Sequence, residues 1–210
     1  MNLANTKTSI IRNFDPFLAA KGENDMWKCY YRHRYIKLFK VTFKFAKSFF
    51  GIELIDSIRL AFYMTIAQAF FKIGQIANIG KETKGKENNL LIIFFIKKAY
   101  DVFNKKFSLN MNTLQLSKLE YRQWYIDRYP YKFKETREEA MADLYSHIYN
   151  VPIDRLMKYA TLRSAAAVIR DEVEGRVEGV IIHHSQHAEH WYDIQNKLEE
   201  AYVELRRVVS

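Results

Sequence analysis

The sequence contains little glycine, proline and cysteine. Its 210 residues include 7 Gly, 3 Pro and 1 Cys, whereas average usage is about 7% Gly and 5% Pro. Because both residues break regular helices, their scarcity favours long helices. The single cysteine, Cys29, cannot form an internal disulfide, so a reducing compartment is the natural location. We therefore expect a cytoplasmic protein in which Cys29 is a small buried hydrophobe.

Long hydrophobic runs are also absent. The longest uncharged apolar stretch, Leu60–Phe71, is far shorter than the ~20 residues that span a bilayer. Residues 1–20 lack the apolar core of a signal peptide. The sequence therefore predicts no transmembrane segment, and any membrane association is expected to be peripheral.

Common catalytic motifs do not occur in the chain. We find no glycine-rich phosphate loop, no nucleophile elbow, no H-E-x-x-H and no C-x-x-C. No reaction is therefore assigned from sequence, and whether the protein is an enzyme stays open.

The composition and periodicity predict an all-α protein. Hydrophobic residues make up 49% of the chain and charged residues 27%, which is typical of a globular domain. Apolar residues recur at helical spacings, and no stretch shows sustained two-residue alternation. Six or seven helices in a bundle or irregular array are expected. They cover about 26–50, 53–79, 90–107, 113–129, 136–149, 152–174 and 184–208.

The same pass along the chain suggests a division into segments. We expect an irregular arm over residues 1–25, a basic amphipathic helical hairpin over 26–79 and a C-terminal helical bundle over 90–210. Between the last two lies a polar stretch, 80–89, with two glycines and no apolar residue, which is typical of a linker. Two separate units and one shared core are both compatible with this pattern.

Positive charge is concentrated in the first half of the chain. Residues 1–109 carry 19 Lys and Arg against 8 Asp and Glu, whereas residues 110–210 carry 14 against 16. On the first predicted helix, Lys37, Lys40, Lys44 and Lys47 fall within an arc roughly 80° wide, opposite a phenylalanine-rich face. With Arg34 they form a basic face. It predicts a binding or adaptor protein that engages an acidic protein or an anionic membrane surface.

Two other functions remain open at this level. Basic residues interleaved with tyrosines around Arg32 permit contact with nucleic acid. A cluster of histidines later in the chain instead suggests a metalloenzyme, because His183 and His187 lie one helical turn apart. A divalent metal would then be held by carboxylates and histidines drawn from Asp143, His147, Glu174, Glu178, His183 and His187.

One further pattern concerns charges inside the predicted bundle. Glu120, Trp124 and Arg128 are spaced by four residues on one helix, and Arg163 and Arg170 are spaced by seven on another. We expect Glu120 and Arg163 to form a buried pair between these helices, either as a structural contact or as a clamp for an anion.

Overall fold

The computed structural model describes residues 11–77, 90–173 and 188–210. Over these residues it contains eight α-helices, one short 3-10 helix and no strand, which confirms the all-α prediction. The elements are α2 (Pro16–Tyr31), α3 (Tyr35–Ser48), α4 (Leu54–Ala77), α5 (Leu90–Phe107), α6 (Thr113–Arg128), η1 (Pro130–Lys132), α7 (Arg137–Tyr149), α8 (Ile153–Val173) and α9 (Ala188–Val209).

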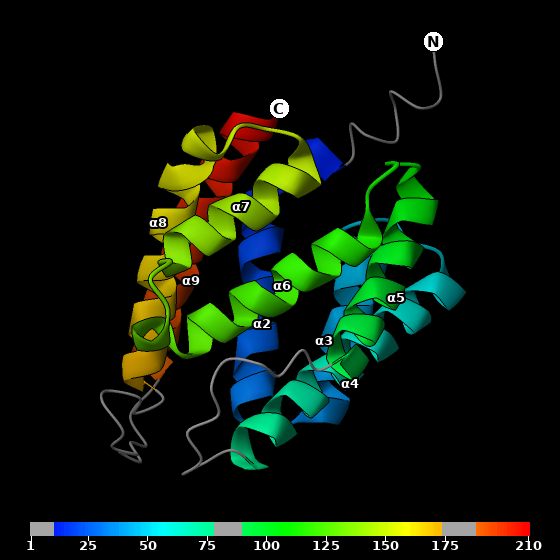
Figure 1. The fold of residues 1–210 in the computed structure, drawn as a ribbon, viewed down its shortest axis with the longest axis horizontal. Coiled ribbons are helices and arrows are strands. Elements are labelled where there is room, and N and C mark those ends of the chain that lie inside the picture. Colours follow the sequence, from blue (N-terminus) through cyan, green and yellow to red (C-terminus); the bar gives the residue numbers. More distant parts are fainter. Residues whose placement is uncertain (1–10, 78–89, 174–187) are drawn as a thin grey trace.

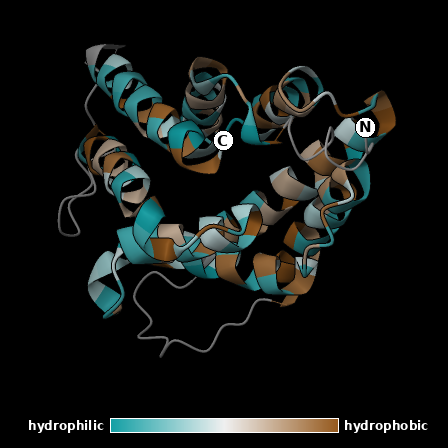
Figure 2. Ribbon diagram, turned by 90° about the horizontal axis from the view of Figure 1, so that it is seen from above, coloured by the Kyte–Doolittle hydropathy of each residue, from teal (hydrophilic) through white to brown (hydrophobic). Residues whose placement is uncertain are grey.

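The helices are arranged as a closed ring. Each helix from α2 to α9 packs mainly against its neighbours along the chain, and α9 packs against α2. The views in Figures 1 and 2 show the helices placed around the middle of the molecule, with the C-terminal α9 beside the N-terminal α2. Each helix of the ring can therefore direct side chains toward one shared interior.

The buried apolar residues form three clusters around this ring. The largest joins residues near the N-terminus to α3, α5, α7, α8 and α9; for example, Ala46 and Phe107 belong to the same cluster as Leu205. A second cluster joins α2, α8 and α9, and a third joins α4, α5 and α6. Helices on both sides of the predicted linker at 80–89 thus share one core, although the linker itself lies outside the described residues.

Local sequence signals explain several helix ends. The Thr136 side chain accepts from the backbone of Glu139, and the Glu139 side chain accepts from the backbone of Thr136, so a capping box opens α7. Helix α7 ends at Tyr149. The cap residue that follows, Asn150, has a left-handed φ of 52°, a conformation that glycine and sometimes asparagine adopt at helix ends. Helix α6 is capped by the Asn112 side chain rather than by Thr113 itself, whose hydroxyl donates to Asp101 Oδ1 at 2.7 Å.

The single helix predicted over residues 26–50 is wrong. Two helices, α2 and α3, occupy this region, and they are separated at His33, which has a left-handed φ of 54°. The backbone N–H of Arg34 then donates to the Cys29 carbonyl at 2.9 Å. This turn redirects the chain, so that the residues on either side of it pack on different neighbours.

The irregular arm predicted over residues 1–25 is also wrong from Pro16 onward, where α2 begins. The Asp15 side chain accepts from the N–H groups of Phe17 and Leu18, and Pro16 stands in the first turn, where proline is tolerated. Cys29 is 3% exposed near the end of α2, which confirms that it is buried.

Candidate functional site

The predicted basic face is an exposed surface of α3. Lys37, Lys40, Lys44 and Lys47 are all exposed, and so is Arg34, which immediately precedes the helix. None of the five forms an ion pair with another residue in the described ranges. Their charge is therefore directed to solvent and is not neutralised by the protein.

The opposite face of α3 packs into the protein. Leu38 and Ala46 are buried, and the Phe45 ring stacks on Phe49 at 4.6 Å between ring centroids. Phe50 in turn packs edge-on against Phe103 of α5. The phenylalanine-rich face of α3 therefore contributes to the interior, and the lysines form its outer side.

Helix α4, which packs against α3, presents an apolar stripe to the exterior. The stripe consists of side chains that are 43–63% exposed, namely Leu54, Ile55, Ile58, Phe62 and Ile73. The segment Leu54–Gly74 is also long and apolar enough to cross a membrane by length and composition, and 28% of it is buried in the protein. Among the described helices it alone has this property. The prediction of no transmembrane segment stays a prediction.

A second group of functional candidates lies inside the ring, where charged side chains are buried. Glu23 of α2 accepts from Arg163 Nε of α8 at 3.0 Å and from the Tyr202 hydroxyl of α9 at 2.8 Å. The Glu23 and Arg163 side chains are only 10% and 11% exposed. This ion pair therefore ties α2, α8 and α9 together in a poorly solvated environment.

Arg170 forms the most deeply buried part of this charge network. Its side chain is 1% exposed, and it donates to Asp127 Oδ2 at 3.0 Å and to Asp171 Oδ1 at 2.9 Å. Its guanidinium also lies 4.6 Å from the ring centroid of Trp27 and 5.0 Å from that of Tyr31. Burial raises the pKa of Asp127, but Arg170 and its neighbouring arginines outweigh this and bring the pKa below its ordinary value.

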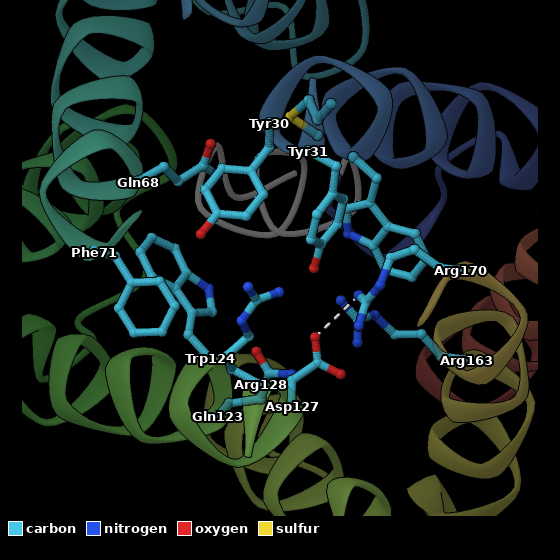
Figure 3. Close-up of a pocket in the computed structure, with 12 residues that line it drawn as sticks. Tyr30, Tyr31, Gln68, Phe71, Gln123, Trp124, Asp127, Arg128, Arg163 and Arg170 are labelled. Atoms are coloured by element: carbon cyan, nitrogen blue, oxygen red, sulfur yellow. Dashed lines mark hydrogen bonds and ion pairs between the residues drawn. The ribbon is translucent and has the colours of Figure 1, made fainter. Parts of the chain in front are cut away.

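Figure 3 shows a pocket of about 80 Å³ beside this network. Tyr30 and Tyr31 of α2 face Trp124, Asp127 and Arg128 of α6 across it. Gln68 and Phe71 of α4 close one side, and Arg163 and Arg170 of α8 close the other. The pocket is thus built by four helices that are distant in sequence.

The predicted pair between Glu120 and Arg163 is wrong in its partners. Glu120 accepts from the Tyr100 hydroxyl and from Trp124 Nε1, each at 2.8 Å, while Arg163 pairs with Glu23. Burial is the main influence on Glu120 and raises its pKa, although both hydrogen bonds and the charge of Arg163 act in the opposite direction. Sequence spacing identified the interior faces correctly but could not assign partners across the ring.

We expect Glu120→Gln to be more stable than the unmodified protein at pH 7. A carboxyl group with a raised pKa stabilises the fold below the pKa of the unfolded chain, and this contribution is lost as pH rises through the folded-state pKa. Glutamine does not ionise, so the variant does not lose this stability as the pH rises to 7. Urea unfolding at pH 7 and pH 4 measures the effect: the advantage of the variant should shrink toward pH 4, and a pH-independent difference would contradict the assignment.

The predicted metal-binding residues are only partly described. Asp143 and His147 lie one turn apart on α7, and His147 Nδ1 is 3.4 Å from Asp143 Oδ1. Asp143 is also engaged by Arg122 at 3.1 Å. Glu174, Glu178, His183 and His187 lie outside the described residues. Within the described ranges, no group of three or more His, Cys, Asp or Glu side chains could hold a metal ion.

Comparison of the chain with protein-family models, with curated proteins and with solved structures found no match in any of the three.

Proposed function

We propose that this protein binds the surface of an anionic membrane through α3 and α4. The observation that carries the proposal is the pairing of two adjoining helices with complementary exposed faces. One presents uncompensated lysines and the other presents an apolar stripe. Stable binding of a protein to a membrane surface generally requires both an electrostatic and a hydrophobic contribution.

The electrostatic contribution comes from the lysines of α3. No Asp or Glu lies between Asp25 and Glu53, so the chain supplies no local counter-charge along this helix. Each lysine close to an anionic bilayer contributes about 1 kcal/mol to binding at physiological ionic strength. The four lysines share one exposed face and can approach a negative surface together.

The hydrophobic contribution comes from α4. Ile55, Ile58, Phe62 and Ile73 are between 43% and 63% exposed, so roughly half of each side chain remains to be removed from water. Fully burying such a side chain is worth about 1.5–3 kcal/mol, and half of this value for four residues is comparable to what the four lysines of α3 provide together. The inner face of α4 is buried against the protein, as Ala61 and Phe71 show, which favours peripheral contact over a spanning orientation.

The apolar stripe also distinguishes a membrane from the two other anionic partners. Nucleic acids are bound by basic grooves with aromatic side chains that stack on bases, and the exposed stripe of α4 is mainly aliphatic. An acidic protein would satisfy the lysines but would also need a matching apolar surface. A lipid bilayer supplies both chemistries without further requirement.

Neutralising the lysine face should weaken membrane binding at least tenfold. The test variant replaces four lysines of α3 by Gln, namely Lys37, Lys40, Lys44 and Lys47. We expect most of this variant to stay in solution when vesicles of 30% phosphatidylserine in phosphatidylcholine are sedimented. The unmodified protein should bind these vesicles, bind pure phosphatidylcholine weakly, and be released as salt rises toward 1 M, where the Debye length is about 3 Å.

A matched control tests whether position or only net charge matters. Changing Lys118, Lys132, Lys134 and Lys158 to Gln, all exposed residues outside α3 and α4, removes the same charge and should leave binding largely intact. The double variant Ile55→Gln, Ile73→Gln should weaken the part of vesicle binding that the unmodified protein retains at high salt. Equal loss in the two lysine variants, or binding of an acidic polypeptide or DNA in preference to the vesicles, would overturn the proposal.

A further inference from the structure

The interior of the ring contains two larger cavities next to the pocket of Figure 3. Their volumes are about 250 Å³ and 240 Å³. Met26 and Gln68 line both of them and also line the pocket, so the three spaces adjoin at these side chains. Together they fall in the size range of small-molecule sites, roughly 300–1,000 Å³.

One end of this space is apolar. The cavity of about 240 Å³ is lined by Phe45, Phe50, Leu60, Met64 and Phe103, together with other mainly apolar side chains. A cavity of about 150 Å³ with comparable lining binds small hydrocarbons. This end therefore fits the apolar body of a ligand and offers few partners for a polar one.

The other end, the pocket of Figure 3, contains buried polar atoms without hydrogen-bond partners. Tyr30 Oη, Gln68 Oε1 and Arg128 Nη1 are buried atoms, and none has a hydrogen-bond partner. In Figure 3 the Tyr30 hydroxyl and the Arg128 guanidinium project into the same space. Burial raises the pKa of Tyr30, so its hydroxyl remains a donor at neutral pH. Turning the Gln68 amide would place a third donor there.

The charges around the pocket indicate the sign of the ligand. The acids along the cavities, Glu23, Glu120 and Asp127, are each held by hydrogen bonds or ion pairs within the protein. The second oxygen of Asp127, which lacks a hydrogen bond, lies 3.5 Å from Arg137 Nε. Arg128 forms no ion pair within the described residues. A positive charge and a neighbouring hydroxyl donor therefore face the pocket, and a carboxylate complements both.

We propose that the ring of helices binds an apolar carboxylic acid, with its carboxylate at Arg128 and Tyr30 and its body in the central cavities past Met26 and Gln68. Such a ligand uses both ends of the site. A neutral molecule would leave the charge of Arg128 without a counter-charge, and a cation would be repelled by it. This site is separate from the lysine face of α3, so it stands or fails independently of membrane binding.

Three single-chain probes with different head groups test the charge preference. Decanoate, decanol and decyltrimethylammonium have unbranched alkyl chains of nearly equal length, and their binding to the full chain can be measured by calorimetry below micellar concentrations. We expect decanoate to bind at least tenfold more tightly than decanol, and the cation to bind more weakly than either. Equal affinities for the three probes, or no binding of decanoate, would overturn the proposal.

Two variants test the placement of the ligand. Arg128→Gln should weaken decanoate binding at least tenfold and leave decanol binding unchanged. Ala99→Leu adds bulk to the apolar cavity lined by Ala99 and should weaken both probes; circular dichroism verifies that the variant folds. The variant lacking the four α3 lysines should bind decanoate normally. If the variant lacking the four α3 lysines loses decanoate binding, or if Arg128→Gln retains it, then the acid binds at the surface and the assignment is overturned.

Discussion

Arg170→Met should lower the free energy of unfolding by about 3–5 kcal/mol, because it leaves buried carboxylates without their main counter-charge. Arg170 is 1% exposed and holds both Asp127 and Asp171. Methionine keeps much of the length and apolar contact of the arginine stem, so the loss reports chiefly on charge. Urea unfolding followed by circular dichroism measures it.

A surface arginine provides the control for this prediction. Arg122 also contacts two carboxylates, Glu135 and Asp143, but its side chain is 45% exposed. Arg122→Met should therefore cost less than about 1 kcal/mol, as exposed ion pairs usually do. If Arg170→Met and Arg122→Met cost the same, the interior is far better solvated than its burial indicates.

The effect of Arg170→Met should also depend on pH. Arg170 helps to keep the pKa of Asp127 below its ordinary value. A carboxyl group with a depressed pKa stabilises the fold above the pKa of the unfolded chain, and this contribution is lost as pH falls through the folded-state pKa. The difference between the variant and the unmodified protein should therefore narrow on acidification below about pH 4, near the ordinary pKa of Asp.

Helix type and most helix limits could be predicted from the sequence because they depend on local chemistry. The helix from Leu90 to Phe107 was predicted where the structure has it, and the helix predicted over 136–149 matches α7 to within one residue. The division at His33 was missed, because neither glycine nor proline marks it and positive φ is uncommon for residues other than glycine. Asp15 before Pro16 is an available start signal for α2 that the polar composition of the region obscured.

The interior site could not be predicted in the same way. Glu23 and Arg163 are 140 residues apart in the chain, and only the packing of α9 on α2, which closes the ring, explains their proximity. Periodicity identifies which side of a helix is buried but not which helix covers it. Helix α4 shows the converse limit: it is apolar on nearly all sides, so its pattern did not reveal that one stripe remains exposed.

The two proposed sites differ in how the fold treats charge. On α3 the lysines are left without acidic partners and exposed, which suits long-range attraction to a surface. Around the pocket, Asp127, Arg163 and Arg170 are paired, whereas Arg128 forms no ion pair with any residue that the structure describes. The interior ion pairs connect helices around the cavity. Their coupling energies therefore report how much each pair contributes to holding these helices around the proposed ligand site.

The pair formed by Glu23 and Arg163 should show this coupling in a double-mutant cycle. Glu23→Gln alone and Arg163→Met alone should each lower the free energy of unfolding by about 3–5 kcal/mol, since each leaves the other charge buried and unpaired. Glu23→Gln retains an acceptor for the Tyr202 hydroxyl, which donates to this side chain at 2.8 Å. The single changes therefore remove a charge without also leaving Tyr202 unsatisfied.

Both changes together should cost less than the sum of the two, because no unpaired charge remains. We expect a coupling energy of about 2–3 kcal/mol, at the upper end for residues in contact. Urea unfolding of the four proteins at pH 7 supplies the cycle. If the two costs add to within about 0.5 kcal/mol, then the carboxylate and the guanidinium act independently, and α2 is held to α8 and α9 by its apolar contacts with Trp191, Ile194 and Leu198 rather than by this ion pair.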